Sequence, residues 1–119
     1  MKKIAQAVFV SLFISLFSMT AFAEFLVKDY KQLKENDAMK IYVEGLGKGF
    51  VYANVVMKKE TNKSLFCKPE KLVLERDNLI RILDDEIKRQ EIDRFDKTQE
   101  APIELILLFG LKNTFPCMK

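Results

Sequence analysis

Few side chains in this sequence could take part in catalysis, and their spacing does not form a known catalytic motif. The chain has no histidine, and the only serine after residue 23 is Ser64, which merely follows Lys63. The densest group of carboxylates is the run Asp84-Asp85-Glu86. Nucleophilic and metal-assisted catalysis need an activated nucleophile or convergent ligands, and neither is evident here. We therefore expect no catalytic residue, no metal site and no cofactor, and a protein that is not an enzyme.

The first 23 residues are organised as a secretory signal peptide. Lys2 and Lys3 form a positive start, an apolar segment follows, and Ala21-Phe22-Ala23 has the A-x-A form at which signal peptidase cleaves. We predict cleavage after residue 23 and export of the remainder to the periplasm. The alternative is an uncleaved membrane anchor, because residues 4–23 are about long enough to span a bilayer.

Charge and length limit the number of domains and the classes of partner that the predicted exported part can have. The signal segment holds two of the chain's 20 basic side chains and none of its 17 acidic ones, so residues 24–119 have a net charge of +1. They contain no tryptophan, and acids alternate with bases along them, without the basic stripe typical of nucleic-acid binding. We expect one domain over residues 24–119, with neither nucleic acid nor, after cleavage, a membrane as partner.

Cys67 and Cys117 are the only cysteines. An even number of cysteines in an exported chain indicates a disulfide, and two thiolates without histidine are too few for a four-ligand zinc site. A bridge between them would close a loop of about 50 residues and stabilise the domain by about 4 kcal/mol. An intermolecular bridge, or two free thiols, is the alternative.

The first half of the exported part predicts two helices. Residues 25–35 have the spacing of a short helix, and Asn36-Asp37 then makes a break and an N-cap. Residues 38–58 predict a longer amphipathic helix, although the segment VYANVV (residues 51–56) would also suit a strand. The apolar stripe of this helix consists of Met39, Tyr42, Val43, Leu46, Phe50, Ala53 and Met57.

Three glycines interrupt this second helix, at positions 45, 47 and 49. Each costs a helix interior roughly 1 kcal/mol relative to alanine. Gly45 and Gly49 are one turn apart, so we expect them to admit a neighbouring helix or a large ring such as Phe115. The alternative is that they admit a side chain of a partner. A phosphate-binding loop is not indicated, because the G-x-G-x-G spacing and the surroundings differ from those of dinucleotide-binding motifs.

The second half alternates polar segments with helices. Residues 58–66 predict a lysine-rich loop, residues 68–70 a turn, and residues 91–100 a second charged linker. Residues 74–91 predict a helix with the acidic run 84–86 on its solvated side, rather than at a calcium site or a site for a basic partner. Pro102 marks the start of a central apolar helix that Asn113 and Pro116 end. The predicted fold is all-α, a small bundle of about four helices with one disulfide.

An ordered set of short motifs resembles the Rap/Tai family of immunity proteins. The set consists of Tyr42-x-x-Gly45 followed by Gly49, then Phe66-Cys67-x-Pro69-Glu70, then Leu79 and Leu83, and finally Thr114-Phe115-Pro116-Cys117. Members are exported proteins that neutralise peptidoglycan amidase toxins delivered by the type VI secretion system. The resemblance, over residues 38–117, implies a small helical domain with a disulfide that binds and inhibits a cell-wall amidase effector.

One feature differs from many members of this family. They carry further cysteines near the first helix and before the Tyr-x-x-Gly segment, whereas residues 32–40 contain none here. A second disulfide is therefore not expected. The second candidate function is that of a periplasmic acid-stress chaperone, because such chaperones are also small helical domains with one disulfide.

The two polar segments, residues 58–64 and 91–100, are the candidate projections that bind a partner, because loops on a rigid scaffold commonly carry binding. Long cationic side chains offer charge-assisted contacts, and an aromatic side chain in a charged loop can anchor an interface. The candidates are Lys58, Lys59, Lys63, Arg94 and Phe95. A second copy of the chain is a further potential partner, as a homodimer.

Overall fold

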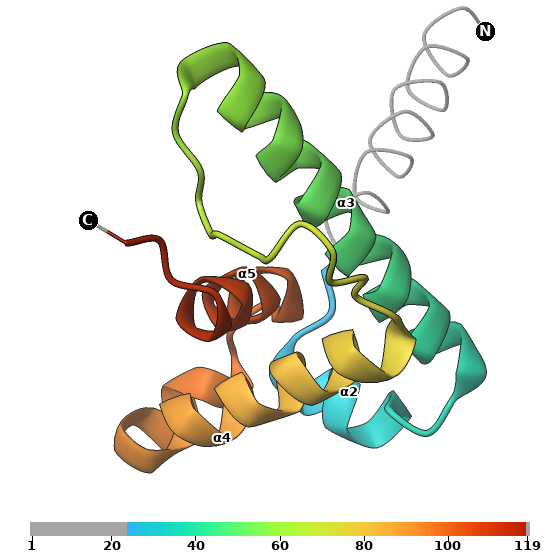
Figure 1. The fold of residues 1–119 in the computed structure, drawn as a ribbon. Helices are drawn as coiled ribbons and strands as arrows, with labels where there is room; N and C mark the ends of the chain where they lie inside the picture. Colours follow the sequence, from blue (N-terminus) through green and yellow to red (C-terminus); the bar gives the residue numbers. More distant parts are fainter. Residues whose placement is uncertain (1–23, 119) are drawn as a thin grey trace, which may run out of the picture.

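The computed structural model describes residues 24–118, and the predicted signal peptide lies outside them. Four helices follow one another in this part of the chain, namely α2 (Val27–Leu33), α3 (Asp37–Thr61), α4 (Arg76–Gln99) and α5 (Ile103–Thr114). In Figure 1, α2, α4 and α5 gather beside the first half of α3, while its second half extends away from them. The prediction of an all-α fold with about four helices is confirmed. No helix within the described residues is long and apolar enough to cross a membrane.

The segment before α2 is joined to the start of α5. Leu26 and Pro102 form an isolated antiparallel bridge, in which the Val27 amide donates to the Ala101 carbonyl at 2.9 Å and the Ile103 amide to the Phe25 carbonyl at 2.8 Å. Val27 is fully buried beside this bridge. The beginning of the described part of the chain is thus held against a helix from its far end.

The two halves of α3 have different surroundings. Asn36 caps the helix by accepting a hydrogen bond from the Ala38 amide at 2.8 Å, as predicted. The buried residues, Met39, Val43 and Gly47, recur at four-residue intervals and all lie in the first half. No residue from 51 to 61 is buried, although all of them are helical, so the alternative of a strand over residues 51–56 is wrong. The predicted loop at residues 58–66 is wrong in part, because α3 continues to Thr61.

The predicted packing role of Gly45 and Gly49 is wrong. A Cβ atom at either position would meet nothing within 4 Å. Gly47 is the glycine at a helix contact, since a Cβ atom there would lie 2.5 Å from Cδ2 of Leu79 in α4. The reason is the register of α3: one turn after the buried Val43, it is Gly47 that faces the core.

A kink divides α4, which is longer than predicted. The expected linker at residues 91–100 is helical up to Gln99, and the one interruption is at Arg94 (φ −143°, ψ 48°). The buried Thr98 donates its hydroxyl to the Arg94 carbonyl at 2.7 Å. The linker prediction failed because this part of α4 is mostly exposed, so its sequence lacks the apolar period that would indicate a helix.

The acidic run of α4 is not simply a solvated face. Asp85 is exposed, but Asp84 accepts a hydrogen bond from the Tyr30 hydroxyl at 2.7 Å, and Glu86 is only 3% exposed. Consecutive residues of a helix point in different directions. One of the three carboxylates therefore faces α5 instead of solvent, which corrects the prediction.

The apolar helix α5 is central, as predicted. It begins after Pro102 as its N-cap, and its buried residues are Ile103, Ile106, Leu107, Gly110 and Leu111. It ends at Thr114, one residue beyond the predicted Asn113. The chain then returns to the centre of the sequence, where Cys67 and Cys117 form the predicted disulfide with an S–S distance of 2.06 Å. Beside the disulfide, the Cys67 amide donates to the Phe115 carbonyl at 2.8 Å.

Candidate binding surface

The projecting half of α3 carries several exposed apolar side chains close together, including Tyr52, the most exposed large apolar side chain of the helix. We define the arm as residues 51–67, which comprise the second half of α3 and the segment that turns back from it (Figure 1). Tyr52 is 71% exposed and Val56 52%, and Val55 and Leu65 are also exposed. Contiguous apolar side chains on the surface of a small domain commonly mark a place where another molecule binds.

A groove of about 550 Å³ lies between α3 and the returning chain. The nearly inaccessible ring of Phe66 and the side chain of Val51 form its apolar part, and lysines from both sides form part of its rim. Its lining residues are Val51, Asn54, Val55, Lys58 and Lys59 from α3, and Ser64, Phe66, Cys67, Lys68 and Glu70 from the following segment.

Asn54 holds the two sides of the arm together. Its side-chain amide nitrogen donates to the Phe66 carbonyl at 2.8 Å, and its side-chain oxygen accepts from the Leu65 amide at 2.7 Å. At the far end, Asn62 adopts a left-handed conformation (φ 59°), and its amide donates to the Lys58 carbonyl at 3.0 Å. With the disulfide at Cys67, these contacts make the arm a defined surface rather than a free loop.

The charge at the tip of the arm is predominantly positive. Lys58, Lys59 and Lys63 are exposed, and Glu60 is the acid among them. None of the ion pairs formed within residues 24–118 involves these three lysines. The arm therefore presents apolar side chains flanked by cations that form no ion pair within the described residues, which suits an acidic protein surface with an apolar centre.

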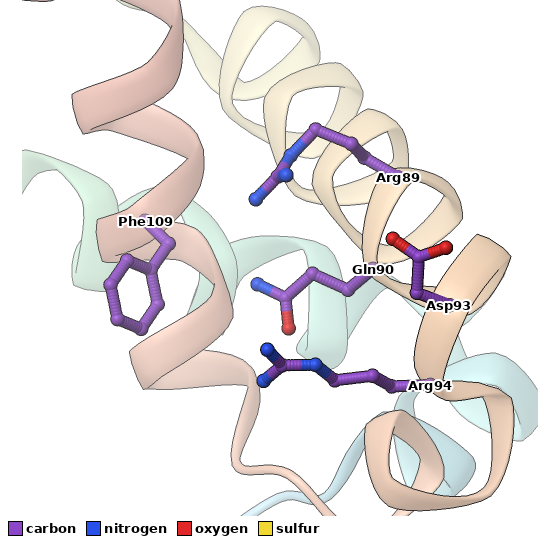
Figure 2. Close-up of a pocket in the computed structure, with 5 residues that line it drawn as sticks. All are labelled: Arg89, Gln90, Asp93, Arg94 and Phe109. Carbon is purple, nitrogen blue, oxygen red and sulfur yellow. The ribbon is translucent and has the colours of Figure 1, made fainter.

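A second, smaller pocket of about 240 Å³ lies between α4 and α5. The side chains of Arg89, Gln90 and Arg94 extend from α4 toward the helix that carries Phe109 (Figure 2). Asp93 completes the lining. Two arginines and one aspartate line this pocket, whereas three lysines and one glutamate line the groove, so the pocket has the smaller excess of positive charge.

A buried carboxylate beside this pocket fixes two of its lining residues. Glu86 accepts hydrogen bonds from Arg89 at 2.5 and 2.9 Å, from Gln90 at 2.8 Å and from Asn113 at 3.0 and 3.2 Å. Burial would raise the pKa of Glu86, but these hydrogen bonds more than offset it and leave the pKa below its usual value. Arg89 and Gln90 thus have a structural role in holding the Glu86 carboxylate, and Asn113 joins this carboxylate to α5.

The five predicted binding residues do not form one surface. Lys58 and Lys59 line the groove, and Lys63 lies at the tip of the arm, whereas Arg94 lines the pocket. Phe95 lies elsewhere again, with the Nζ atom of Lys31 from α2 5.1 Å from the centre of its ring. The prediction that Arg94 and Phe95 lie on a projecting loop is wrong, because residues 91–99 are helical and belong to α4.

Several residues of the family motifs contribute to the packing of the domain. Phe66 is buried, Phe115 is packed against the core, and the Tyr42 hydroxyl donates to Glu104. Pro69 and Pro116 are exposed next to the disulfide-linked segments. Gly45 and Gly49 are exposed, and a Cβ atom at either position would meet nothing within 4 Å.

The exposed apolar residues of the arm, Tyr52, Val55 and Val56, were not predicted as binding residues. A sequence signal for them exists, because they fall off the apolar stripe of α3 while the helix continues through them. In the part of the chain that the structure describes, no group of three or more acidic or cysteine side chains is placed to hold a metal ion.

Comparisons with known proteins add no relative: no family model, no curated protein and no solved structure matches this chain. The resemblance to the Rap/Tai family stays an interpretation of its short motifs.

Proposed function

We propose that this protein is an exported immunity protein that binds a cell-wall amidase effector of the type VI secretion system and blocks it without turnover. The observation that carries the proposal is the arm, a helical half with no buried residue that places exposed apolar and cationic side chains beside a groove. The motif resemblance supplies the class of partner. The predicted signal peptide would place the protein in the compartment where such an effector attacks peptidoglycan.

The arm suits a protein partner better than a small ligand. Tyrosine is enriched among residues that dominate binding energy, and Tyr52, Val55 and Val56 offer such a centre along one helix. Exposed cations contribute little affinity by themselves, but they guide encounter and fix orientation. We therefore expect the apolar residues to determine the dissociation rate and the lysines to determine the association rate.

The proposal is tested by co-expressing the exported protein with a panel of amidase effectors and measuring survival and binding. At least one effector should be neutralised and bound below micromolar Kd. The Tyr52→Ala variant should weaken binding by about tenfold or more, and the double variant Lys58→Glu, Lys59→Glu should slow association. Its matched control reverses two exposed lysines of α4, in Lys88→Glu, Lys97→Glu, and should bind normally.

Two outcomes would contradict parts of this proposal. If no effector is neutralised and none binds, the immunity function is wrong. Suppression of aggregation of other proteins at low pH would then favour the chaperone function. If binding occurs but the arm and control variants behave alike, the partner binds at a different surface.

A further inference from the structure

One buried oxygen atom in this domain has no partner. Oε2 of Glu104, in the first turn of α5, is buried and accepts no hydrogen bond from residues 24–118. The other oxygen of this carboxylate, Oε1, accepts the Tyr42 hydroxyl. An unsatisfied buried acceptor of this kind costs about 1–3 kcal/mol, and more when the group is charged. A hydrogen-bond donor placed beside this oxygen atom would remove that cost.

The contacts around the short bridge indicate where that donor could come from. Leu26 pairs with Pro102, and the Ile103 amide donates to the Phe25 carbonyl at 2.8 Å, so Glu24, the residue before Phe25, lies beside the first turn of α5, which contains Glu104. A second observation agrees with this placement. Burial, the hydrogen bond to Glu104 and the charges of Glu104 and Glu24 together raise the pKa of Tyr42 to about 12, so both carboxylates act on the same phenol.

We propose that cleavage of the signal peptide after Ala23 creates the missing donor, the α-ammonium group of Glu24, which binds Oε2 of Glu104. Hydrolysis of the Ala23–Glu24 peptide bond consumes one water molecule, leaves a carboxylate on Ala23, and frees an amine that takes up a proton. Before cleavage the same nitrogen is a neutral amide. Processing therefore both releases the protein and completes the contact between its new N-terminus and α5.

The titratable groups that face this position are Glu104 from α5, Tyr42 from α3 and the side chain of Glu24 itself. A free α-amino group ordinarily has a pKa of about 7.7–8.0. Pairing with the Glu104 carboxylate stabilises the charged form and raises this pKa in the folded protein. The stabilisation is thus complete below about pH 7.7 and disappears as the pH rises through the higher pKa of the folded state.

The first test is the intact mass of the protein exported from the full chain, which should correspond to a start at Glu24. A different start overturns the proposal. The second test compares the melting temperature of protein that begins at Glu24 with that of protein carrying a Gly-Ser-Gly extension, in the wild type and in Glu104→Gln. The extension should lower the melting temperature by about 4–8 °C in the wild type at pH 6–7, and by much less in Glu104→Gln.

Equal effects of the extension in the two backgrounds would overturn the proposal. Should Glu104→Gln fail to fold, an NMR titration of the Glu24 amine in the wild type decides the question alone. A pKa clearly above 8 supports the pair, and a value in the ordinary range of about 7.7–8.0 refutes it. None of these measurements depends on the identity of the partner bound by the arm.

Discussion

Replacing Gly47 and Gly49 by alanine, one at a time, tests how α3 is packed. Both glycines lie in the same helix, so each replacement gains up to about 1 kcal/mol of helix propensity. At Gly49 the new Cβ atom meets nothing within 4 Å, whereas at Gly47 it would lie 2.5 and 2.7 Å from the two methyl groups of Leu79. Leu79 is fully buried and has little freedom to move, so overpacking should cost about 1–3 kcal/mol.

The difference between the two variants isolates this contact, because the gain in helix propensity cancels. Gly49→Ala should be up to about 1 kcal/mol more stable than the wild type. Gly47→Ala should be about 1–3 kcal/mol less stable than Gly49→Ala, or about 4–8 °C lower in melting temperature per kcal/mol. Urea unfolding of the disulfide-bonded domain, residues 24–119, followed by circular dichroism, measures both stabilities. Equal stabilities of the two variants would refute the packing of Gly47 against Leu79.

Three further predictions concern other contacts. Cys117→Ser should lower the free energy of unfolding by about 2–5 kcal/mol, and thiol labelling of the unreduced wild type should find no free cysteine; two labelled thiols would contradict the disulfide. Because the folded-state pKa of Glu86 lies below its ordinary 4.5, its stabilisation is present above about pH 4.5 and lost as the pH falls through the lower value. Glu86→Gln should therefore unfold with a weaker pH dependence in acid, and an unchanged dependence would assign the acid sensitivity elsewhere. Asn54→Ala should cost about 1–3 kcal/mol of stability and increase hydrogen exchange at the Leu65 amide; unchanged exchange there would mean that Asn54 does not hold the arm.

Much of the fold follows from local sequence patterns. The apolar period of residues 38–58 and the run of apolar residues after Pro102 predict α3 and α5, and Asn36 and Pro102 lie at helix starts as their chemistry predicts. The disulfide follows from a count of two cysteines in a chain with a predicted export signal. Where the apolar period is absent, in the second half of α4, the prediction failed because a helix exposed on most sides has no need of one.

Most of the candidate surface depended on contacts between distant residues. The sequence indicated lysine-rich and arginine-containing segments, but only the tertiary structure divides them between the arm and α4. It likewise decides that Glu86 is buried while its neighbour Asp85 is not.

By itself, the sequence determined the helical class, the cysteine pairing and the short supply of nucleophiles, because these depend on residue types and on spacing within single segments. Only the tertiary structure decided which glycine meets Leu79, where α3 leaves the core, and that the segment before α2 lies against the start of α5. Those features depend on the register between helices. Register is set by the packing of side chains far apart in the chain, and no local period records it.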